Sequence, residues 1–548
     1  MAYTSLANIP ADKWMALNTS VGGRLHADGV PFSRPCFTSY ELNFSNETKC
    51  TARQRDYLSE AYRVDTFGSA MNPQWETCQA TSQGCLMDWM NPANSDAFAS
   101  PKICHQGSVS RYYIDVLSPS DVAAAFDFAR VTGARIVIKN TGHDYKGRSY
   151  APDSLSLWTH NLQQISYDPT FVPAQCTDTA MTPGLTVGAG VVFGKIYDYA
   201  EQNGITFVGG TDRTVGASGG WVQGGGHSLL SNTLGLGVDR ALEFKIVTPN
   251  GDFLTVNACQ NQDLFFALRG GGGGTFGVVM ETTFRVEPRP ISLRVAKITF
   301  PTTSDNWKAV IDIGVKNALK WSEEAWSGIM GSGMVLFTNP NLSLDEASAS
   351  FQPFADFASS VNGTLVIEDS PTWLTFFNKY ITGNPILSQP VGLPGTPASR
   401  LVPKRHFENT ASQAALKDAI LSGTLPAQFK QVLISCPVNY VPPTGATPEA
   451  SDTSITEAWR SCLWSVVAGT FWNYATDAAG VQASYAKSTE AIRPLKELTP
   501  DGGAYSNEAN VYEGDHTREF WGSNYPRLLS IKQKYDPEGL LDCWHCGT

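Results

Sequence analysis

The sequence predicts an α+β protein made of several structural units. A strand at 109–117, a helix at 121–133 and a second strand at 135–140 follow one another closely, as in a βαβ unit. From 291 to 499, apolar strands and amphipathic helices occur without this alternation, which favours an α+β unit with a mostly antiparallel sheet. The chain has 548 residues, and at about 150 residues per domain this length exceeds a single core.

Residues 1–107 are rich in turn residues and show no sustained hydrophobic period, so we expect an extension packed on the main body. Of the 11 cysteines in the chain, five lie here, as in many disulfide frameworks: Cys36, Cys50, Cys78, Cys85 and Cys104. An odd total leaves at least one thiol unpaired. No second ligand pair matches the spacing of Cys543 and Cys546, so we expect a terminal disulfide there and no metal site.

Glycosylation signals agree with the cysteine pattern. Asn-x-Ser/Thr sequons occur at Asn18, Asn43, Asn46, Asn341 and Asn362. Both features are typical of an oxidising compartment outside the cytosol. We therefore expect a secreted glycoprotein whose signal peptide has been removed.

The unit that begins at residue 108 has clear local signals. Ser118, Pro119 and Asp121 supply an N-cap, a proline at the first helical position and an acidic third residue, and Gly133 ends the helix. Strand and helix patterns then alternate over 185–287, and a Pro-containing boundary follows near residue 290. In the next unit, 291–499, helices are expected at 305–322 and 478–497. Residues 500–548 contain one more amphipathic helix.

Composition excludes several classes of function. The chain has 40 basic and 51 acidic residues, a net charge of −11 and no basic run, which disfavours nucleic-acid and anionic-membrane partners. Charged residues make up only 17% and hydrophobic ones 42%, so the chain folds around a large core. No apolar stretch approaches the roughly 18 residues of a membrane helix.

Glycine is concentrated in three loops, at 142–147, 209–226 and 270–277. Residues 272–277 formally match the dinucleotide pattern G-x-G-x-x-G, but a helix precedes the run and a strand follows it, the reverse of the order that a nicotinamide site requires. Three loops without side chains in a βαβ-containing unit still favour a large anionic cofactor, because backbone amides can approach phosphate or a flat ring.

Four segments carry a resemblance to a known family: IVIKNTGHDYKGRS, GGTDRTVGASGGWVQGGGHS, DLFFALRGGGGGTFGVV and YDPEGLL. Together they resemble the flavin-linked oxidases of the vanillyl-alcohol oxidase superfamily, in particular the fungal berberine-bridge-like branch that includes proteins called isoamyl alcohol oxidases. The resemblance covers 108–290 and 500–548 and is weak in between. It implies a two-subdomain FAD-binding domain of the PCMH type at 108–290, a substrate domain at 291–499 and a C-terminal segment, 500–548, that returns to the FAD domain.

The resemblance also implies how FAD is held. His143 stands where the family forms a covalent bond to the 8α-methyl group of FAD. Many relatives add a second bond from a cysteine in the loop that is 210–216 here, and this loop has none, so a single histidyl linkage is expected. The other residues expected to bind the cofactor are Asn140, Thr141, Gly142, Asp144, Gly147, Ser149, Gly210, Thr211, Gly216, Gly219, Gly220, Gly225, Gly226 and Val278.

The catalytic candidates lie near the C-terminus. Tyr505 and Asn507 match a Tyr-x-Asn motif that enters the pocket in relatives, while Glu508 replaces the aromatic residue usual there. Removal of a hydride from an alcohol carbon requires a base for the hydroxyl proton, and Tyr505 and Glu508 are equal candidates for it. His160 and Trp221 are expected beside the flavin. His227 is expected to be structural, and His406 has no functional context.

The resulting expectation is a monomeric FAD-dependent oxidase that takes a hydride from the CH–OH carbon of a small molecule and passes the electrons to O2, giving hydrogen peroxide. An oligosaccharide oxidase and an oxidative cyclase of a secondary metabolite are alternatives within enzymes. An alternative of another class is a flavin-binding glycoprotein that has lost turnover.

Overall fold

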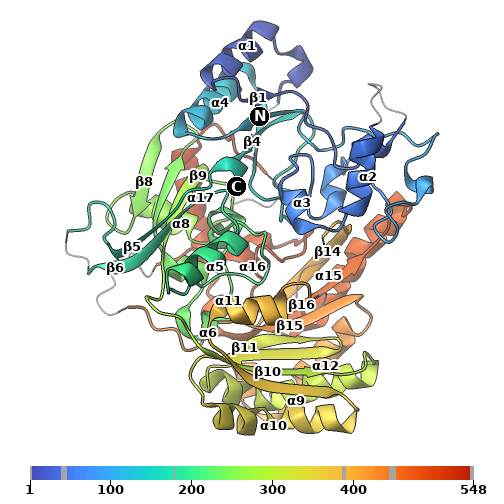
Figure 1. Ribbon diagram of the computed structural model, residues 1–548, viewed down its shortest axis with the longest axis vertical. Helices are drawn as coiled ribbons and strands as arrows, with labels where there is room; N and C mark the ends of the chain where they lie inside the picture. Colours follow the sequence, from blue (N-terminus) through green and yellow to red (C-terminus); the bar gives the residue numbers. More distant parts are fainter. Residues whose placement is uncertain (1–2, 39–45, 178–179, 385–390, 444–451, 544–548) are drawn as a thin grey trace.

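Three β-sheets and the helices that cover them form the protein, as Figure 1 shows. The structure is a computed structural model that describes residues 3–38, 46–177, 180–384, 391–443 and 452–543. A four-stranded sheet lies at the top of Figure 1, a five-stranded sheet at the left and a seven-stranded sheet in the lower half. Helices and antiparallel sheets together confirm the predicted α+β class.

The first sheet contains the predicted βαβ elements in a different order. Its strands, in spatial order, are β1 (Leu25–His26), β2 (Tyr112–Asp115), β4 (Ser154–Trp158) and β3 (Arg135–Lys139). The two strands of the βαβ unit, β2 and β3, run parallel but do not pair directly, because β4 lies between them and runs parallel to both. All five side chains of β4 are buried, which suits the centre of a sheet covered on both faces.

Helix α4 (Pro119–Thr132) joins β2 to β3 and has the predicted ends. Ser118 and Asp121 form a capping box, and Pro119 occupies the first turn. Gly133 ends the helix with φ of 74°, a left-handed conformation that costs glycine little. Val122, Phe126 and neighbouring side chains of its buried face join the core beneath this sheet, against α1 (Ala11–Ser20).

The second sheet is antiparallel throughout. Its strands, in spatial order, are β5 (Ile165–Phe171), β6 (Thr182–Gly188), β9 (Val278–Arg285), β7 (Ala241–Val247) and β8 (Phe253–Asn257). Four helices belong to the same stretch of chain: α5 (Phe193–Gln202), α6 (Ser231–Leu234), α7 (Gly237–Arg240) and α8 (Gln262–Leu268). The glycine run 270–277 therefore lies between helix α8 and strand β9, as the sequence predicts.

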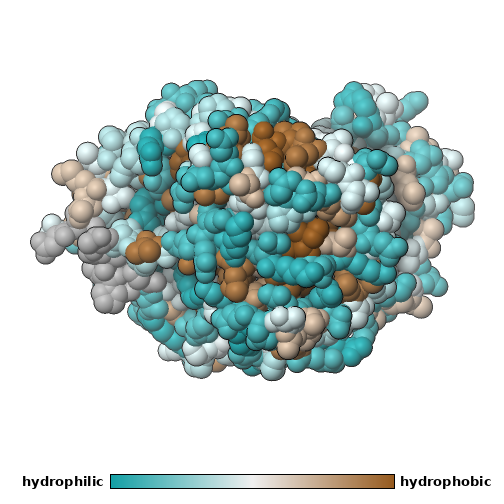
Figure 2. Space-filling view, turned by 90° about the horizontal axis from the view of Figure 1, so that it is seen from below, coloured by the Kyte–Doolittle hydropathy of each residue, from teal (hydrophilic) through white to brown (hydrophobic). Residues whose placement is uncertain are grey.

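The third sheet is also antiparallel between all neighbours. Its order is β13 (Thr364–Ser370), β10 (Leu293–Thr299), β12 (Met334–Asn339), β11 (Ser327–Gly331), β15 (Phe429–Ile434), β16 (Cys462–Phe471) and β14 (Gly395–Pro403). Its core is shared with α9 (Ser304–Glu323), α10 (Leu344–Ser360), α12 (Thr410–Thr424) and α15 (Ala478–Leu498). Seen from below, the surface is mainly polar with smaller apolar areas between (Figure 2). Two further short helices are α11 (Trp373–Phe376) and α14 (Ala458–Ser461).

The N-terminal extension packs against the four-stranded sheet through a buried lysine. Lys139, at the end of β3, donates from Nζ to the backbone carbonyls of Phe67 and Ser69, the latter at 2.7 Å. Burial lowers the pKa of Lys139 to about 7, and the nearby Glu76 opposes this shift. The extension also carries α2 (Glu47–Arg55) and α3 (Glu60–Val64), at the right of Figure 1.

Four disulfides join described cysteines: Cys36–Cys50, Cys85–Cys104, Cys176–Cys259 and Cys436–Cys462. Cys78 is a free thiol among the described residues, and Cys543 is disulfide-bonded, while Cys546 lies outside the described range. Of the sequon asparagines, Asn46, Asn341 and Asn362 are exposed, Asn18 is half-buried and Asn43 lies outside the described residues. In the part of the chain that the structure describes, no helix is long and apolar enough to span a bilayer.

The C-terminal segment returns to the glycine run. It contains α16 (His516–Trp521) and α17 (Tyr525–Tyr535). Lys532 donates to the backbone carbonyl of Thr275 at 2.8 Å, and the Trp521 indole donates to that of Gly270 at 3.0 Å. These bonds fix the glycine run from behind, where its own glycines offer no side chains for packing.

Candidate active site

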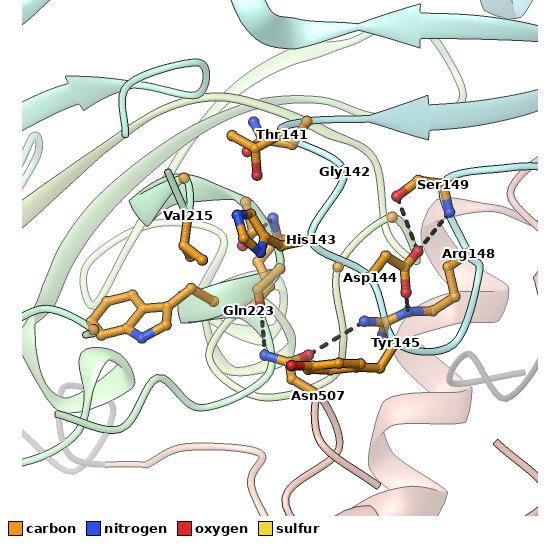
Figure 3. A pocket seen from close by; sticks show the side chains of 18 of the residues that line it. Thr141, Gly142, His143, Asp144, Tyr145, Arg148, Ser149, Val215, Gln223 and Asn507 are labelled. Atoms are coloured by element: carbon orange, nitrogen blue, oxygen red, sulfur yellow. Dashed lines mark hydrogen bonds and ion pairs between the residues drawn. The ribbon is translucent and has the colours of Figure 1, made fainter. Parts of the chain in front are cut away.

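A deep cavity lies where the three sheets and the C-terminal segment meet. Its lining includes residues from all three glycine-rich loops, from strands β11 and β15 of the seven-stranded sheet, and from the segment around residue 507. Figure 3 shows His143, Asp144 and Asn507 around the same space. The fold therefore brings together the loops that the sequence analysis assigned to a cofactor and the residues that it assigned to catalysis.

His143 occupies the loop after β3 and belongs to a short relay. Its Nε2 lies 2.7 Å from the hydroxyl of Thr214, and this hydroxyl donates to Oδ1 of Asp212 at 2.9 Å. The imidazole is 16% exposed, through the cavity. Burial lowers the pKa of His143, and the Asp212 carboxylate opposes this shift. The side chain is therefore a neutral imidazole with access to the cavity, the form that can act as a nucleophile.

Asp144 organises the loop that carries His143. Its carboxylate accepts hydrogen bonds from the backbone N–H groups of Lys146 and Ser149, at 3.1 and 2.7 Å, and from the Ser149 hydroxyl at 3.0 Å. Arg148 adds an ion pair at 3.6 Å. Gly147 has φ of +71°, and a Cβ there would lie 2.3 Å from the Trp75 ring. The loop therefore requires glycine at 147 for packing.

Several cavity-lining glycines leave open space toward the cavity. A Cβ on Gly220 or Gly274 would meet no heavy atom within 4 Å, so the space in front of these backbones is open. By contrast, a Cβ on Gly216 would lie 2.1 Å from Oδ1 of Asn140. Glycine at 220 and 274 therefore leaves room for a flat or phosphate-bearing group, while glycine at 216 allows close packing of the protein itself.

Unsatisfied polar atoms line the same cavity. Asn140 Oδ1, Asp212 Oδ2 and Gln223 Oε1 are buried and have no hydrogen-bond partner among the described residues. Leaving a buried polar atom unpaired costs about 1–3 kcal/mol, so three around one cavity indicate a polar ligand. With the open glycine backbones and the neutral His143, these groups fit a large cofactor such as FAD.

Most of the residues predicted to bind the cofactor line this cavity: Asn140, Thr141, Gly142, His143, Asp144, Ser149, Gly210, Thr211, Gly216, Gly219 and Gly220. Four others lie behind the lining. Gly147 packs on Trp75, Gly225 faces the Tyr505 ring and Gly226 faces the Trp221 ring. Val278 is fully buried in the core beneath the four-stranded sheet.

The catalytic candidates form one corner of the cavity. Asn507 donates from Nδ2 to the Tyr505 hydroxyl and to the Gly220 carbonyl, both at 2.8 Å, and accepts from Arg148 at 3.3 Å. Glu508 lies beside them and is 17% exposed. Burial, and then the Glu508 charge, raises the pKa of Tyr505 well above its ordinary value of 10.0.

Two histidines differ from expectation. His227, expected to be structural, lines the cavity, and its Nε2 lies 2.9 Å from Oε1 of Glu508. His160, expected beside the flavin, stacks on Trp158 and faces Asp65 at 3.4 Å, while its neighbour Thr159 reaches the cavity. The position of His227 directly after the glycine cluster was the signal in the sequence. His406 lies in a short turn after β14, away from the cavity lining, and Trp221 lines the cavity as expected.

Part of the cavity lining comes from residues 291–499, where the resemblance is weak. Ile329 and Leu433 supply apolar side chains there, and Gln431 and Ser435 add polar ones. Ile329 belongs to β11, and Gln431 and Leu433 to β15. Sequence reasoning missed these residues because a strand pattern does not reveal which strand faces a cavity.

Comparison with known proteins agrees with the site. Two family models match: "FAD binding domain" over residues 111–257 and "Berberine and berberine like" over residues 504–542. The "FAD-linked oxidoreductase ffsJ" of Aspergillus flavipes is 39% identical, over 97% of this chain and 91% of that protein. The "Bifunctional decalin synthase calF" of Penicillium decumbens is 30% identical, over 97% of this chain and 90% of that protein.

A solved structure gives the same result for the fold. The VAO-type flavoprotein MtVAO615 from Myceliophthora thermophila C1 superposes with a TM-score of 0.86 at 27% identity, covering 100% of this chain and 97% of that chain. Sequence relatives, family models and fold agree with the cavity chemistry described above. The chain therefore belongs to the FAD-linked oxidoreductases of the vanillyl-alcohol oxidase superfamily, in the berberine-bridge-like branch.

Proposed function

We propose that this protein is an oxidase that removes a hydride from the CH–OH carbon of a small-molecule alcohol and passes the electrons to O2, giving hydrogen peroxide. The observation that carries the proposal is the neutral His143 imidazole at the edge of a cavity built from glycine backbones. When bound, FAD supplies a two-electron acceptor that no amino-acid side chain can replace. The chain's own residues hold this group, orient the alcohol and take up its proton.

A single covalent linkage through His143 is part of the proposal. Loop 210–216 contains no cysteine, and the cysteines nearest to it in sequence, Cys176 and Cys259, are joined to each other. Backbone around Gly142, Gly220 and Gly274 would hold the rest of FAD. Residues 108–290 with 500–548 would form the FAD-binding part, and 291–499 the substrate part.

Tyr505, Asn507 and Glu508 are proposed as the catalytic group. They line the same cavity as the apolar side chains of Leu229 and Leu433. An apolar wall favours a hydrophobic alcohol over an oligosaccharide, because sugar hydroxyls need hydrogen-bond partners when they are buried. An oxidative cyclase of a secondary metabolite is the second candidate, supported by the similarity to a decalin synthase.

Secretion and glycosylation complete the proposal, together with a monomeric state. Four disulfides support an oxidising compartment, and the sequons at Asn46, Asn341 and Asn362 are exposed to glycosyl transfer. Digestion with an N-glycosidase, followed by mass spectrometry of the secreted protein, tests all three sites.

Two measurements test the function. Acid precipitation of the purified protein is expected to leave yellow flavin with the protein, and His143→Ala is expected to release it. Anaerobic mixing with a panel of primary and secondary alcohols is expected to bleach the flavin. A flavin that no alcohol, sugar or polyketide bleaches would instead indicate a binding protein without turnover.

A further inference from the structure

Two side chains from distant parts of the chain form a hydrogen bond inside the cavity. His227 follows the glycine cluster, and Glu508 lies in the C-terminal segment. Nε2 of His227 lies 2.9 Å from Oε1 of Glu508. The two side chains are 16% and 17% exposed, and both line the cavity. The pair is therefore shielded from bulk water and accessible to a ligand.

Aromatic packing fixes the orientation of the pair. The His227 ring meets the Tyr505 ring edge to face, with centroids 5.2 Å apart and an angle of 83°. The ring centroid of Trp459 lies 6.5 Å from that of His227 and 5.5 Å from that of Tyr505. The backbone N–H of Glu508 donates to the Tyr505 carbonyl at 3.0 Å. A pair held in this way loses little entropy when a substrate arrives.

The phenols in this corner are suited to donate protons and not to accept them. The Tyr505 oxygen already accepts hydrogen bonds from Asn507 and from the Gly226 backbone N–H. These two bonds lower the pKa of Tyr505, but burial and the Glu508 charge outweigh them and raise it. Burial and the Glu508 charge also raise the pKa of Tyr145 well above its ordinary value. Both hydroxyls stay protonated at neutral pH.

We propose that the Glu508 carboxylate accepts the hydroxyl proton of the substrate, and that His227 is the positioning residue that holds this carboxylate through its Nε2–H. The proposal rests on the proposed function and decides between its two candidate bases, because it gives Tyr505 the role of a hydrogen-bond donor to the substrate oxygen. If Tyr505 were the base, its phenol would need a positively charged neighbour to stabilise the phenolate. The carboxylate of Glu508 needs no such neighbour, because His227 already holds it.

The proton and electron balance is simple. The O–H bond of the alcohol breaks and its proton forms a bond to Glu508. The C–H bond breaks and its hydrogen leaves with both electrons for the bound flavin, which is the oxidant, while the carbon and oxygen form a carbonyl. The charged or titratable groups facing Glu508 during this step are His227, Tyr145 and Tyr505, with Arg148 near Tyr505.

The test compares single and double variants by anaerobic stopped-flow reduction of the bound flavin, with 3-methylbutan-1-ol and benzyl alcohol in the panel. Glu508→Gln is expected to slow reduction at least about 100-fold, the usual contribution of a general base. His227→Leu is expected to slow it about tenfold, and the double variant no more than Glu508→Gln alone, since the two act as one unit. Tyr505→Phe should cost less than Glu508→Gln.

A matched pair outside the cavity serves as control. His26 and Asp115 lie 3.3 Å apart at the outer sheet edge, with 37% and 24% of their side chains exposed. His26→Leu and Asp115→Asn are expected to leave flavin reduction unchanged. All variants are first checked for unchanged flavin content by absorbance, which separates a loss of chemistry from a loss of folding.

Two further readouts do not depend on turnover. A tertiary alcohol has no hydrogen on its carbinol carbon, so it binds without reacting, and calorimetry is expected to show at least fivefold weaker binding to Glu508→Gln. The rate of flavin reduction in the wild type is expected to fall at acidic pH, and His227→Leu should move this acidic limb to higher pH, because the carboxylate loses its N–H donor. A residue that only supports the fold would lower the rate without moving the limb.

The outcomes are distinct. If no alcohol bleaches the wild-type flavin, the proposed oxidation fails and this assignment fails with it. If the wild type is bleached and Glu508→Gln is bleached at a similar rate, only the assignment of the base is overturned. An unmoved acidic limb in His227→Leu overturns the positioning role of the histidine.

Discussion

The hydroxyl of Thr214 bridges Nε2 of His143 and Oδ1 of Asp212, at 2.7 and 2.9 Å. An ionised carboxylate only accepts hydrogen bonds, so Thr214 donates to Asp212 and accepts from His143. This order places the imidazole proton on Nε2 and leaves the lone pair on Nδ1. A bond to a carbon atom requires that lone pair, so we expect FAD to be attached through Nδ1.

Thr214→Val tests this relay, because valine keeps the shape of threonine and removes the hydroxyl. We expect covalent incorporation of FAD into the apoprotein to slow about fivefold, the equivalent of losing one hydrogen bond of about 1 kcal/mol that orients the ring. The amount of flavin that stays with acid-precipitated protein over time measures it. Thr214→Ser should restore the rate, and incorporation at the wild-type rate in Thr214→Val would exclude the relay.

The pH dependence of incorporation follows from burial of His143. Burial, opposed by Asp212, lowers the pKa of His143 below its ordinary 6.5. The imidazole therefore remains neutral and nucleophilic at pH values where an exposed histidine is protonated. We expect any fall in the rate of covalent attachment on acidification to have its midpoint below pH 6.5. A rate that falls with a midpoint at or above 6.5 would contradict the effect of burial.

Local signals in the sequence predicted the elements well but not their neighbours. The ends of α4 follow from Ser118, Pro119 and Gly133, whose capping chemistry is local. The pairing of β2 and β3 with β4 depends on the loop that returns after residue 140, and neither strand encodes this. Strand order is set by burial of β4 from both sides, a tertiary effect.

The residues of the candidate site likewise include some that sequence motifs predict and others that only the fold brings together. Each glycine loop, including the one that contains His143, is a short continuous stretch of sequence, so it could be predicted from a motif. His227 and Glu508 are 281 residues apart, and neither is unusual until the fold places them 2.9 Å from each other. The apolar wall from β11 and β15 is likewise set by which strand faces the cavity. Sequence motifs therefore predict the loops expected to bind the cofactor, whereas the residues on the substrate side of the cavity are determined by how distant segments pack.

Gly220→Ala tests where the cofactor lies. A Cβ at this position meets no protein atom within 4 Å, so the apoprotein should fold with its thermal midpoint within about 2 °C of the wild type, the shift expected for less than 1 kcal/mol. If FAD lies against this backbone, the methyl group should lower FAD content at least tenfold. Gly514→Ala is the control, since Gly514 is exposed and equally open. Full flavin content in Gly220→Ala would place the cofactor elsewhere.

Glu60 is expected to make stability depend on pH. Burial, and then the Asp212 charge, raises the pKa of Glu60 from 4.5 to about 7. The folded state therefore binds a proton more tightly than the unfolded state, so this contribution is complete below pH 4.5 and is lost as the pH rises to 7. Glu60→Gln stays neutral at every pH. Its free energy of unfolding, taken relative to that of the wild type, should therefore be about 1 kcal/mol higher at pH 8 than at pH 4.5, allowing for solvent screening.

Thermal unfolding of both proteins at the two pH values measures this difference. The gain should appear as a larger midpoint difference at pH 8. An identical difference at both pH values would mean that the carboxyl group titrates at its ordinary value.

The buried pair Arg400–Glu519 joins strand β14 to helix α16 and should control how firmly the C-terminal segment is attached. The two side chains are 1% and 0% exposed, and Glu519 also pairs with Arg518 at 2.9 Å. Glu519→Ala leaves the Arg400 charge buried without its carboxylate, which should lower the free energy of unfolding by about 3–5 kcal/mol in urea titration. The exposed pair Arg405–Asp501 is the control, where Asp501→Ala should cost less than about 1 kcal/mol.

Because α16 begins eight residues after Glu508, the Glu519 variant should also lose flavin more readily on mild denaturation. Equal costs for the two variants would mean that the buried pair does not fasten the segment that carries Tyr505 and Glu508.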